Sequence, residues 1–167
     1  MGKISNLLHI MKKALLFLLT TFLCTSLFAW QWNKEGNLVT ISANSKSSFV
    51  SYYSTAPWFD DEIKELHIVI NEGITSIEPS CFQGSKNIVS VTIPDSCTII
   101  KEDAFRDCPN LFNVSIPTNT KLVIKDRAFY DCPNLTPVIT GSKTVLGKDV
   151  FKLSQPKIGT VQSVIKG

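Results

Sequence analysis

Cysteines are the residues of this chain with the most chemical potential. Four follow residue 29, at Cys81, Cys97, Cys108 and Cys132. In an exported protein, four cysteines can form two disulfides, in three alternative pairings. Their spacing is not that of a zinc site, where cysteines and histidines come in close pairs. The sequence therefore predicts no metal and no other cofactor.

Acid–base chemistry has few candidates. His67 is the one histidine after residue 29, and it lies in a predicted strand. The acidic clusters at residues 60–62 and 102–103 are most simply solvated turns. General acid–base catalysis needs a paired acid and base in a cleft. No glycine-rich phosphate loop or nucleophile elbow is present either. We therefore expect no catalytic residues, and a protein that is not an enzyme.

The N-terminal segment, residues 1–29, has the pattern of a secretory signal peptide. Residues 11–13 are Met-Lys-Lys, residues 14–23 are apolar, and the small residues Ser26 and Ala29 follow. The apolar run is shorter than the ~20 residues of a membrane span. We expect cleavage near Ala29, no membrane span afterwards, and a periplasmic, surface-held or released protein. An uncleaved anchor and a lipid anchor on Cys24 are the alternatives.

Charge argues against one class of partner. The whole chain has a formal net charge of +3, and Lys3, Lys12 and Lys13 account for all of it. The chain from residue 30 onward is therefore neutral. A protein that binds nucleic acid needs a basic stripe to displace counterions from the phosphates. We expect no nucleic-acid partner and no docking of a polybasic patch on a membrane.

A repeat organises the rest of the chain. Four phenylalanines recur at nearly even intervals, and the interval lies in the low twenties. Asparagine, an aliphatic residue and, in two copies, cysteine keep nearly the same step. A period of this length indicates a stacked solenoid. The core positions of the repeat are Phe82, Phe105, Phe129, Phe151; Asn87, Asn110, Asn134; Ile88, Leu111, Leu135; Cys108 and Cys132.

Each repeat contains one strand pattern and one turn pattern. Short β-branched stretches with alternating apolar residues predict half-buried strands. They cover residues 88–93, 111–116 and 135–140. Charged residues around Ala-Phe predict tight turns or short helical bends over residues 101–107 and 125–131, with the Phe inward. Stacked repeats then give one parallel sheet with turns opposite. The asparagines are expected to bond backbone groups of the turns.

Two cysteines occupy equivalent places in successive repeats. Cys108 and Cys132 should lie one rung apart, about 4.8 Å, which a disulfide tolerates. Side chains stacked in register run parallel, which disfavours the bond. A free cysteine also packs well as a small hydrophobic residue. We favour buried thiols, with a Cys108–Cys132 bridge as the alternative.

The repeat resembles the BspA-like class of leucine-rich repeats. Residues 100–117 read IKEDAFRDCPNLFNVSIP, and residues 128–135 read AFYDCPNL. The class has an Ala-Phe-x-x-Cys-x-x-Leu core and an Ile-Pro strand end, with a glycine where Lys101 and Lys125 stand here. The resemblance covers residues 57–152. It implies a right-handed coil of about 3–4 repeats, secreted or held at the surface for adhesion or protein binding, without catalytic residues.

Four segments are expected. They are a signal peptide (1–29), an N-terminal cap (30–64), the repeats (65–152) and a C-terminal cap or tail (153–167). In the cap, Trp30, Trp32 and the alternating residues 38–41 could cover the first coil. The last coil is degraded because its asparagine is absent.

Side chains on the solvent side of the strands form the candidate binding face. They are small and nearly uncharged, which suits the surface of another protein, either a host extracellular protein or an envelope protein. The alternative is a structural envelope protein that self-assembles into a homo-oligomer without a different ligand. The predicted face residues are His67, Val69, Ser90, Thr92, Asn113, Ser115, Pro137 and Ile139.

Overall fold

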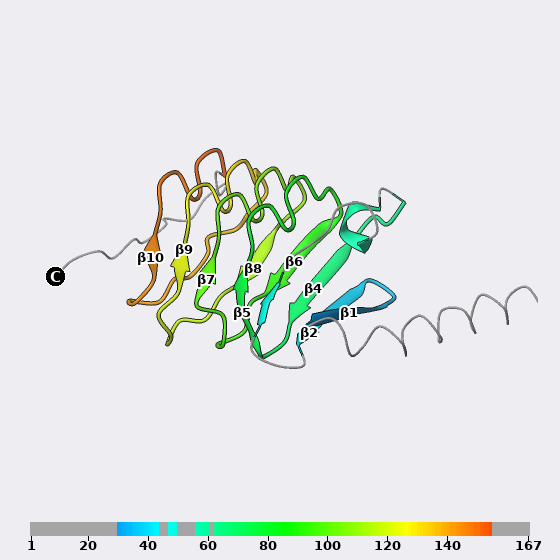
Figure 1. Cartoon of the computed structure of the whole chain (residues 1–167). Helices are drawn as coiled ribbons and strands as arrows, with labels where there is room; N and C mark the ends of the chain where they lie inside the picture. Colours follow the sequence, from blue (N-terminus) through cyan, green and yellow to red (C-terminus); the bar gives the residue numbers. More distant parts are fainter. Residues whose placement is uncertain (1–29, 44–46, 50–55, 61, 155–167) are drawn as a thin grey trace, which may run out of the picture.

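The described part of the protein is a β-solenoid with almost no helix. The structure, a computed structural model, describes residues 30–43, 47–49, 56–60 and 62–154. The expected signal peptide, and residues 155–167 of the expected tail, lie outside the described residues. Successive coils stack side by side, from the hairpin β1–β2 at one end to β10 at the other (Figure 1). The predicted mainly β solenoid with parallel strands is confirmed.

One face of the solenoid is a five-stranded sheet, here called sheet A. Strand β1 closes its N-terminal edge antiparallel to β2, and all the other neighbours are parallel. Pro94 and Pro117 follow the last inward residues of two coils, where a donor for the ladder is no longer needed. In order, the strands are β1 (Trp30–Glu35), β2 (Leu38–Ala43), β4 (Leu66–Ile70), β6 (Ile88–Thr92) and β8 (Asn113–Ser115).

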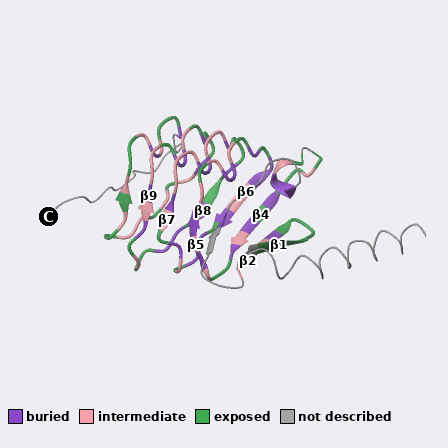
Figure 2. Cartoon of the chain, viewed as in Figure 1, coloured by how far each residue is buried: buried purple, intermediate pink, exposed green. Residues whose placement is uncertain are grey.

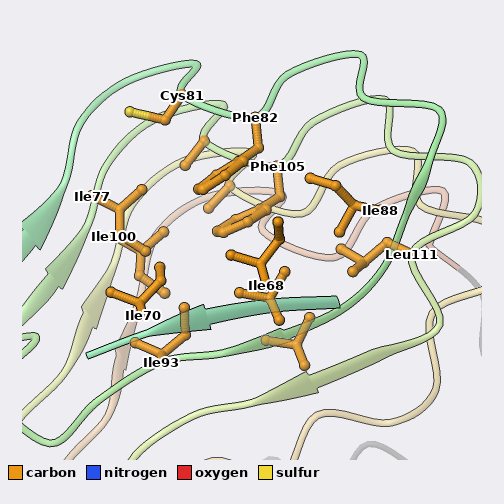
Figure 3. Packing of buried hydrophobic residues seen from close by; sticks show 14 of the residues in the cluster. Ile68, Ile70, Ile77, Cys81, Phe82, Ile88, Ile93, Ile100, Phe105 and Leu111 are labelled. Carbon is orange, nitrogen blue, oxygen red and sulfur yellow. The ribbon is translucent and has the colours of Figure 1, made fainter. Parts of the chain in front are cut away.

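A second parallel sheet, here called sheet B, lies opposite sheet A. The sequence pattern predicted only one sheet, because the strands of sheet B are very short and fall in the stretch before each turn. Inside the solenoid, Ile77 packs beside Ile100 and faces the strands of sheet A (Figure 3). The strands are β3 (Ser47–Phe49), β5 (Ile74–Ile77), β7 (Ile99–Ile100), β9 (Val123–Ile124) and β10 (Val145–Leu146).

The strand predicted for residues 135–140 is absent. Thr136 still donates its N–H to the carbonyl of Phe112 at 2.8 Å, so the segment begins along β8. The next residue, Pro137, has no N–H to continue a ladder. The prediction was therefore wrong for this coil: a β-branched pattern around a proline follows the sheet without joining it.

The repeated phenylalanines form one column of stacked rings. Ring centroids are 4.7 Å apart for Phe82 and Phe105, 5.1 Å for Phe105 and Phe129, and 5.6 Å for Phe129 and Phe151. The column extends toward the N-terminus, because Phe49 stacks on Phe82 at 5.3 Å. Trp58 also covers Phe82, at 5.0 Å, from the short 3-10 helix Pro57–Phe59. Figure 3 shows the rings of Phe82 and Phe105 lying over each other between the two sheets.

The turns around the rings are linked by their own backbone ladder. Phe82 donates its N–H to Ala104, Phe105 to Ala128 and Phe129 to Val150, at 2.8–3.0 Å. In the first three turns, the residues two before and two after each ring donate in the same direction. Nearly all of the flanking residues have a positive φ although they are not glycines. They are Ser80, Asp103, Asp107, Arg127, Asp131, Asp149 and Leu153, with Gly84 in the eighth place.

Thiols pack inside this column. Cys108 and Cys132 each lie one turn after a ring, and each donates to the carbonyl of the ring residue in the preceding coil, Phe82 or Phe105, at 3.1 Å. Ser154 holds the same position in the last coil and bonds the carbonyl of Phe129. Cys97, Cys108 and Cys132 are free and buried, which agrees with the preference for buried thiols over a Cys108–Cys132 bridge.

The repeated asparagines bond backbone carbonyl groups of the preceding coil. The amide of Asn87 is buried and donates to the carbonyls of Pro57 and Asp60, both at 3.0 Å. Asn110 and Asn134 are exposed, and each donates to one carbonyl group. These side chains therefore tie neighbouring coils together.

We predict that Phe105→Ala lowers the free energy of unfolding by about 3–5 kcal/mol, because it leaves a cavity in the middle of the ring column. Chemical denaturation followed by circular dichroism measures the change. Phe112→Ala is the matched control: this ring is 55% exposed, so its loss should change stability by less than about 1 kcal/mol. Equal effects of the two substitutions would contradict the inward placement of Phe105.

We further predict that the four thiols are protected only while the protein is folded. Burial raises the pKa of the Cys97 thiol to about 11. The neighbouring Cys132 thiol and burial raise the pKa of Cys108 as well. The contact with Cys108 lowers the pKa of Cys132, so burial alone protects this thiol, which is 0% exposed. Because a reagent must reach the thiolate, a Cys24→Ser chain should react negligibly with a thiol reagent at pH 8. After unfolding without reductant, all four should react; a count of two would indicate a disulfide.

Candidate binding face

Two rows of side chains run across the outer face of sheet A. The parallel register places His67 beside Ser90 and Ser90 beside Asn113 in one row. In the other row, Val69 lies beside Thr92, and Thr92 beside Ser115. We call these six residues the outer rows. The structure thus brings together six of the eight predicted face residues.

Alternation along each strand keeps the outer rows out of the core. Ile68, Val91 and Val114 each lie between the two row residues of their strand. They point inward and are at most 5% exposed. The row residues are exposed, except for Val69 and Ser90, which are half-buried. Figure 2 shows this change of burial along β4 and β6. The core is therefore complete without the outer rows, and their side chains can be exchanged at little cost in stability.

Hydrogen bonds between rungs order part of this face. A ring nitrogen of His67, Nδ1, lies 2.7 Å from the hydroxyl oxygen of Ser90. Near the N-terminal edge, the amide of Asn71 donates to the hydroxyl of Ser42 at 3.0 Å. The outer rows contain hydroxyl, amide, imidazole and aliphatic groups and no carboxylate, ammonium or guanidinium. Such a surface offers hydrogen bonds and flat apolar contact rather than ionic attraction.

Pro137 and Ile139 are placed differently from the other predicted residues. Each follows its row by the repeat step, but the segment is not a strand. Pro137 is exposed, and Ile139 is 78% exposed. They extend the outer rows only as a loop beside β8.

Two members of the rows lie outside the predicted face. Leu38 lies beside His67, and Thr40 lies beside Val69, because β2 pairs with β4. The sequence pattern predicts a cap for both residues. A signal was available: residues 38–41 read Leu-Val-Thr-Ile, and residues 90–93 read Ser-Val-Thr-Ile. Leu38 is 41% exposed, so it adds apolar area at the edge of the rows.

Other surfaces are less suited to a partner. The outer side of sheet B has a single narrow row, in which Ile99 and Val123 are half-buried and Val145 is 50% exposed. On the turns, the guanidinium of Arg127 donates to both carboxylate oxygens of Asp103, at 2.9 and 2.8 Å. This contact lowers the pKa of Asp103 and ties two coils together. Both surfaces serve the stack itself.

Two other kinds of site are absent from the described part of the chain. It contains no cluster of three or more histidine, cysteine or acidic side chains able to hold a metal ion. None of its helices has the length and hydrophobicity to cross a bilayer.

Comparisons with known proteins agree with this architecture. The sequence matches the BspA type leucine rich repeat region in six copies over residues 56–162. Among solved structures, a leucine rich repeat protein of T. pallidum superposes with a TM-score of 0.51 at 22% sequence identity. The match covers 74% of this chain and 53% of that protein, so this chain spans about half its length. No curated protein matches the sequence.

The family match covers more than half of the chain and includes the four coils whose rings are Phe82, Phe105, Phe129 and Phe151. The chain therefore belongs to the BspA-type leucine-rich repeat family.

Proposed function

We propose that this protein is an exported binding module that presents the outer rows of sheet A to another protein. The observation that carries the proposal is that inward and outward residues of each strand have different roles. Inward residues fill the core completely, and outward residues form two continuous rows without charged side chains. Membership of a leucine-rich repeat family supports a protein as the ligand. The contact residues are the outer rows together with Leu38, Thr40, Pro137 and Ile139.

The size of the face sets the expected affinity. Five neighbouring rungs (strands β2, β4, β6 and β8 and the loop with Pro137) about 4.8 Å apart, with outward side chains along roughly 15–20 Å, give on the order of 300–400 Å². A standard protein interface buries about 800 Å² on each partner, and smaller ones are weak or transient. We therefore expect a dissociation constant on the order of micromolar or weaker for one copy, and tighter binding when several copies act together.

The pattern of residues 1–29 supports export to the periplasm, the cell surface or the medium. In those compartments, a host extracellular protein or an envelope protein is the accessible partner, and adhesion is the corresponding role. Thiols in an exported protein need protection from oxidation, and burial provides it for Cys97, Cys108 and Cys132. The proposal needs no metal and no cofactor.

The test is to place charge on the outer rows. Ser90→Lys, Thr92→Lys, Asn113→Lys and Ser115→Lys together should leave the melting temperature within a few degrees and lower binding at least tenfold. Binding is measured by surface plasmon resonance on purified extracellular-matrix and envelope proteins. The matched control adds the same charge at exposed polar positions elsewhere: Thr98→Lys, Thr118→Lys, Asn119→Lys and Ser142→Lys. Unchanged binding by the first variant, or equal losses in both, would move the site away from sheet A.

We also predict that salt hardly affects this binding. The outer rows carry no permanent charge, so counterion screening has little to act on. The dissociation constant should change by less than about threefold between 50 and 500 mM NaCl. A loss of more than tenfold over this range would indicate ion pairs and a site on the charged turns.

A further inference from the structure

Strand β1 is the edge strand of sheet A at the N-terminal end of the solenoid (Figure 1). Among the described residues, it pairs with β2 on one side and with no strand on the other. The side chains of residues 31–35 are all exposed. An edge strand carries a row of N–H and carbonyl groups that can pair with another chain. What can pair with β1 depends on which of its backbone groups are open.

The hydrogen bonds of β2 identify these open groups. The segment of β4 donates N–H groups to the carbonyls of Asn37 and Ile41. Backbone groups alternate sides along a strand, so odd-numbered residues here bond toward β4 and even-numbered residues of β2 bond toward β1. The register places the even-numbered residues of β2 opposite the odd-numbered residues of β1. The N–H and carbonyl groups of Trp30, Trp32 and Lys34 therefore point out of the sheet.

The hairpin between β1 and β2 leads to the same assignment. Only two residues separate Glu35 from Leu38, which close the hairpin. The closing pair of such a hairpin is hydrogen-bonded, and bonded and non-bonded pairs alternate from there. Lys34 and Trp32 belong to non-bonded pairs, so their backbone groups face the open edge.

The open edge is complementary to a second copy of itself. An antiparallel arrangement about a two-fold axis at Trp32 places Trp32 opposite the same residue of the second copy. It also places Lys34 opposite residue 30 of the second copy. All the open N–H and carbonyl groups of β1 then bond in three pairs. A register shifted by two residues keeps only two such pairs within β1.

The side chains fit this register on both sides of the sheet. Trp32 lies beside the buried Ile41 on the core side, edge-on to Trp58 at 6.4 Å, and is still 36% exposed. Opposite residues of paired strands lie about 4.5–5.5 Å apart, so the two Trp32 rings would cover each other. On the outer side, Gln31 lies opposite Asn33 of the second copy, and their amides can exchange hydrogen bonds.

Charge does not oppose the pairing. Lysine on an edge strand discourages association with another strand. In this register, however, the two Lys34 side chains lie at opposite ends of the paired strands, about 14 Å apart. This separation exceeds the Debye length of about 10 Å at 0.1 M salt. The two Glu35 side chains lie farther apart still, so like charges do not meet.

We infer that β1 pairs with β1 of a second copy, antiparallel about a two-fold axis at Trp32. Residues opposite each other in this register lie on the same side of the sheet, so the axis is perpendicular to it. The two five-stranded sheets then join into one continuous sheet. The outer rows of both copies face the same way.

The size of the contact makes this dimer weak. A strand of six residues is about 20 Å long, and pairing it buries on the order of 300 Å² on each copy. Stable interfaces bury about 800 Å² on each partner. We therefore expect a dissociation constant on the order of 10–100 µM, and dimers mainly where copies are concentrated on one surface.

The dimer would double the binding face, a step that rests on the proposed function. Two sets of outer rows on one sheet offer on the order of 600–800 Å², close to the area that a standard protein interface buries on one partner. One copy alone offers about half of this area. Pairing through β1 is thus a means of raising affinity without adding coils.

The first experiment tests the register by cross-linking. Gln31→Cys and Asn33→Cys are made separately in the Cys24→Ser chain and mixed under mild oxidation. The mixture should give a disulfide-linked dimer with one copy of each variant, because these positions form a non-hydrogen-bonded pair with Cα atoms about 4.5 Å apart. The native thiols after residue 29 are buried and do not compete.

Each cysteine variant alone is the control for this cross-link. Its two thiols lie on a diagonal of the paired strands, with Cα atoms about 7–8 Å apart, beyond the reach of a disulfide. A linked dimer of Asn33→Cys alone would place the axis at residue 33. No linked dimer in the mixture would remove the contact. Either result would overturn the inference.

The second experiment tests the backbone hydrogen bonds by sedimentation equilibrium. Lys34→Pro should weaken dimerisation at least tenfold, because proline lacks the N–H that only the second copy accepts, and an edge strand tolerates it. Lys34→Ala is the matched control: it keeps this N–H and should change the dissociation constant less than threefold. Equal losses in both variants, or an unaltered chain that stays monomeric at 1 mM, would contradict the pairing. If Lys34→Pro unfolds the hairpin, the cross-link decides.

Binding to the partner separates this inference from the proposed function. On a surface coated with the partner, Lys34→Pro should bind at least tenfold more weakly than Lys34→Ala, because only the latter presents two faces together. Equal binding by both variants would keep the dimer and refute the doubled face. A cross-linked dimer that binds none of the purified candidate proteins would count against the proposed function alone.

Discussion

The turn around each buried ring is the constraint on which the stack depends. Its N–H groups point along the solenoid axis, so only the next coil can accept their hydrogen bonds. Holding them in this direction requires positive φ on both sides of the ring, at roughly 1–2 kcal/mol for each residue other than glycine. A buried N–H left without an acceptor costs about 1–3 kcal/mol. A single coil therefore has the backbone strain of positive φ without compensation. A neighbouring coil compensates for it by accepting the N–H hydrogen bonds and by stacking its own ring on the buried one.

This arrangement separates the residues that hold the fold together from those exposed on the outer side of sheet A. Ring stacking, thiol-to-carbonyl bonds and aliphatic packing all lie between the sheets, and the turn ladder lies along one edge. The outer side of sheet A takes part in none of them beyond a few side-chain hydrogen bonds. Substitutions in the outer rows then change what the surface can contact while leaving the stack almost untouched. A scaffold of this kind can serve different ligands with one architecture.

Much of the fold could be predicted because it repeats. The regular step between coils located the four rings and the two equivalent thiols, and alternation located the outer rows. Three features escaped prediction for physical reasons. The strands of sheet B are too short for a periodic signal. Pro137 removes a donor from a stretch that otherwise has strand composition. Arg127 and Leu153 adopt positive φ, which their residue types do not favour and which only the neighbouring coil enforces.

The uniform direction of the turn ladder has a consequence for how such proteins change over generations. The boundaries between the coils of Phe82, Phe105, Phe129 and Phe151 use equivalent backbone donors and acceptors and the same ring contact. A duplicated coil inserted among them would therefore make the same contacts on both sides. Duplication or deletion of one coil then changes the length of the solenoid without requiring a new type of coil–coil interface. Partner choice can consequently evolve by resizing the surface as well as by replacing single residues on it.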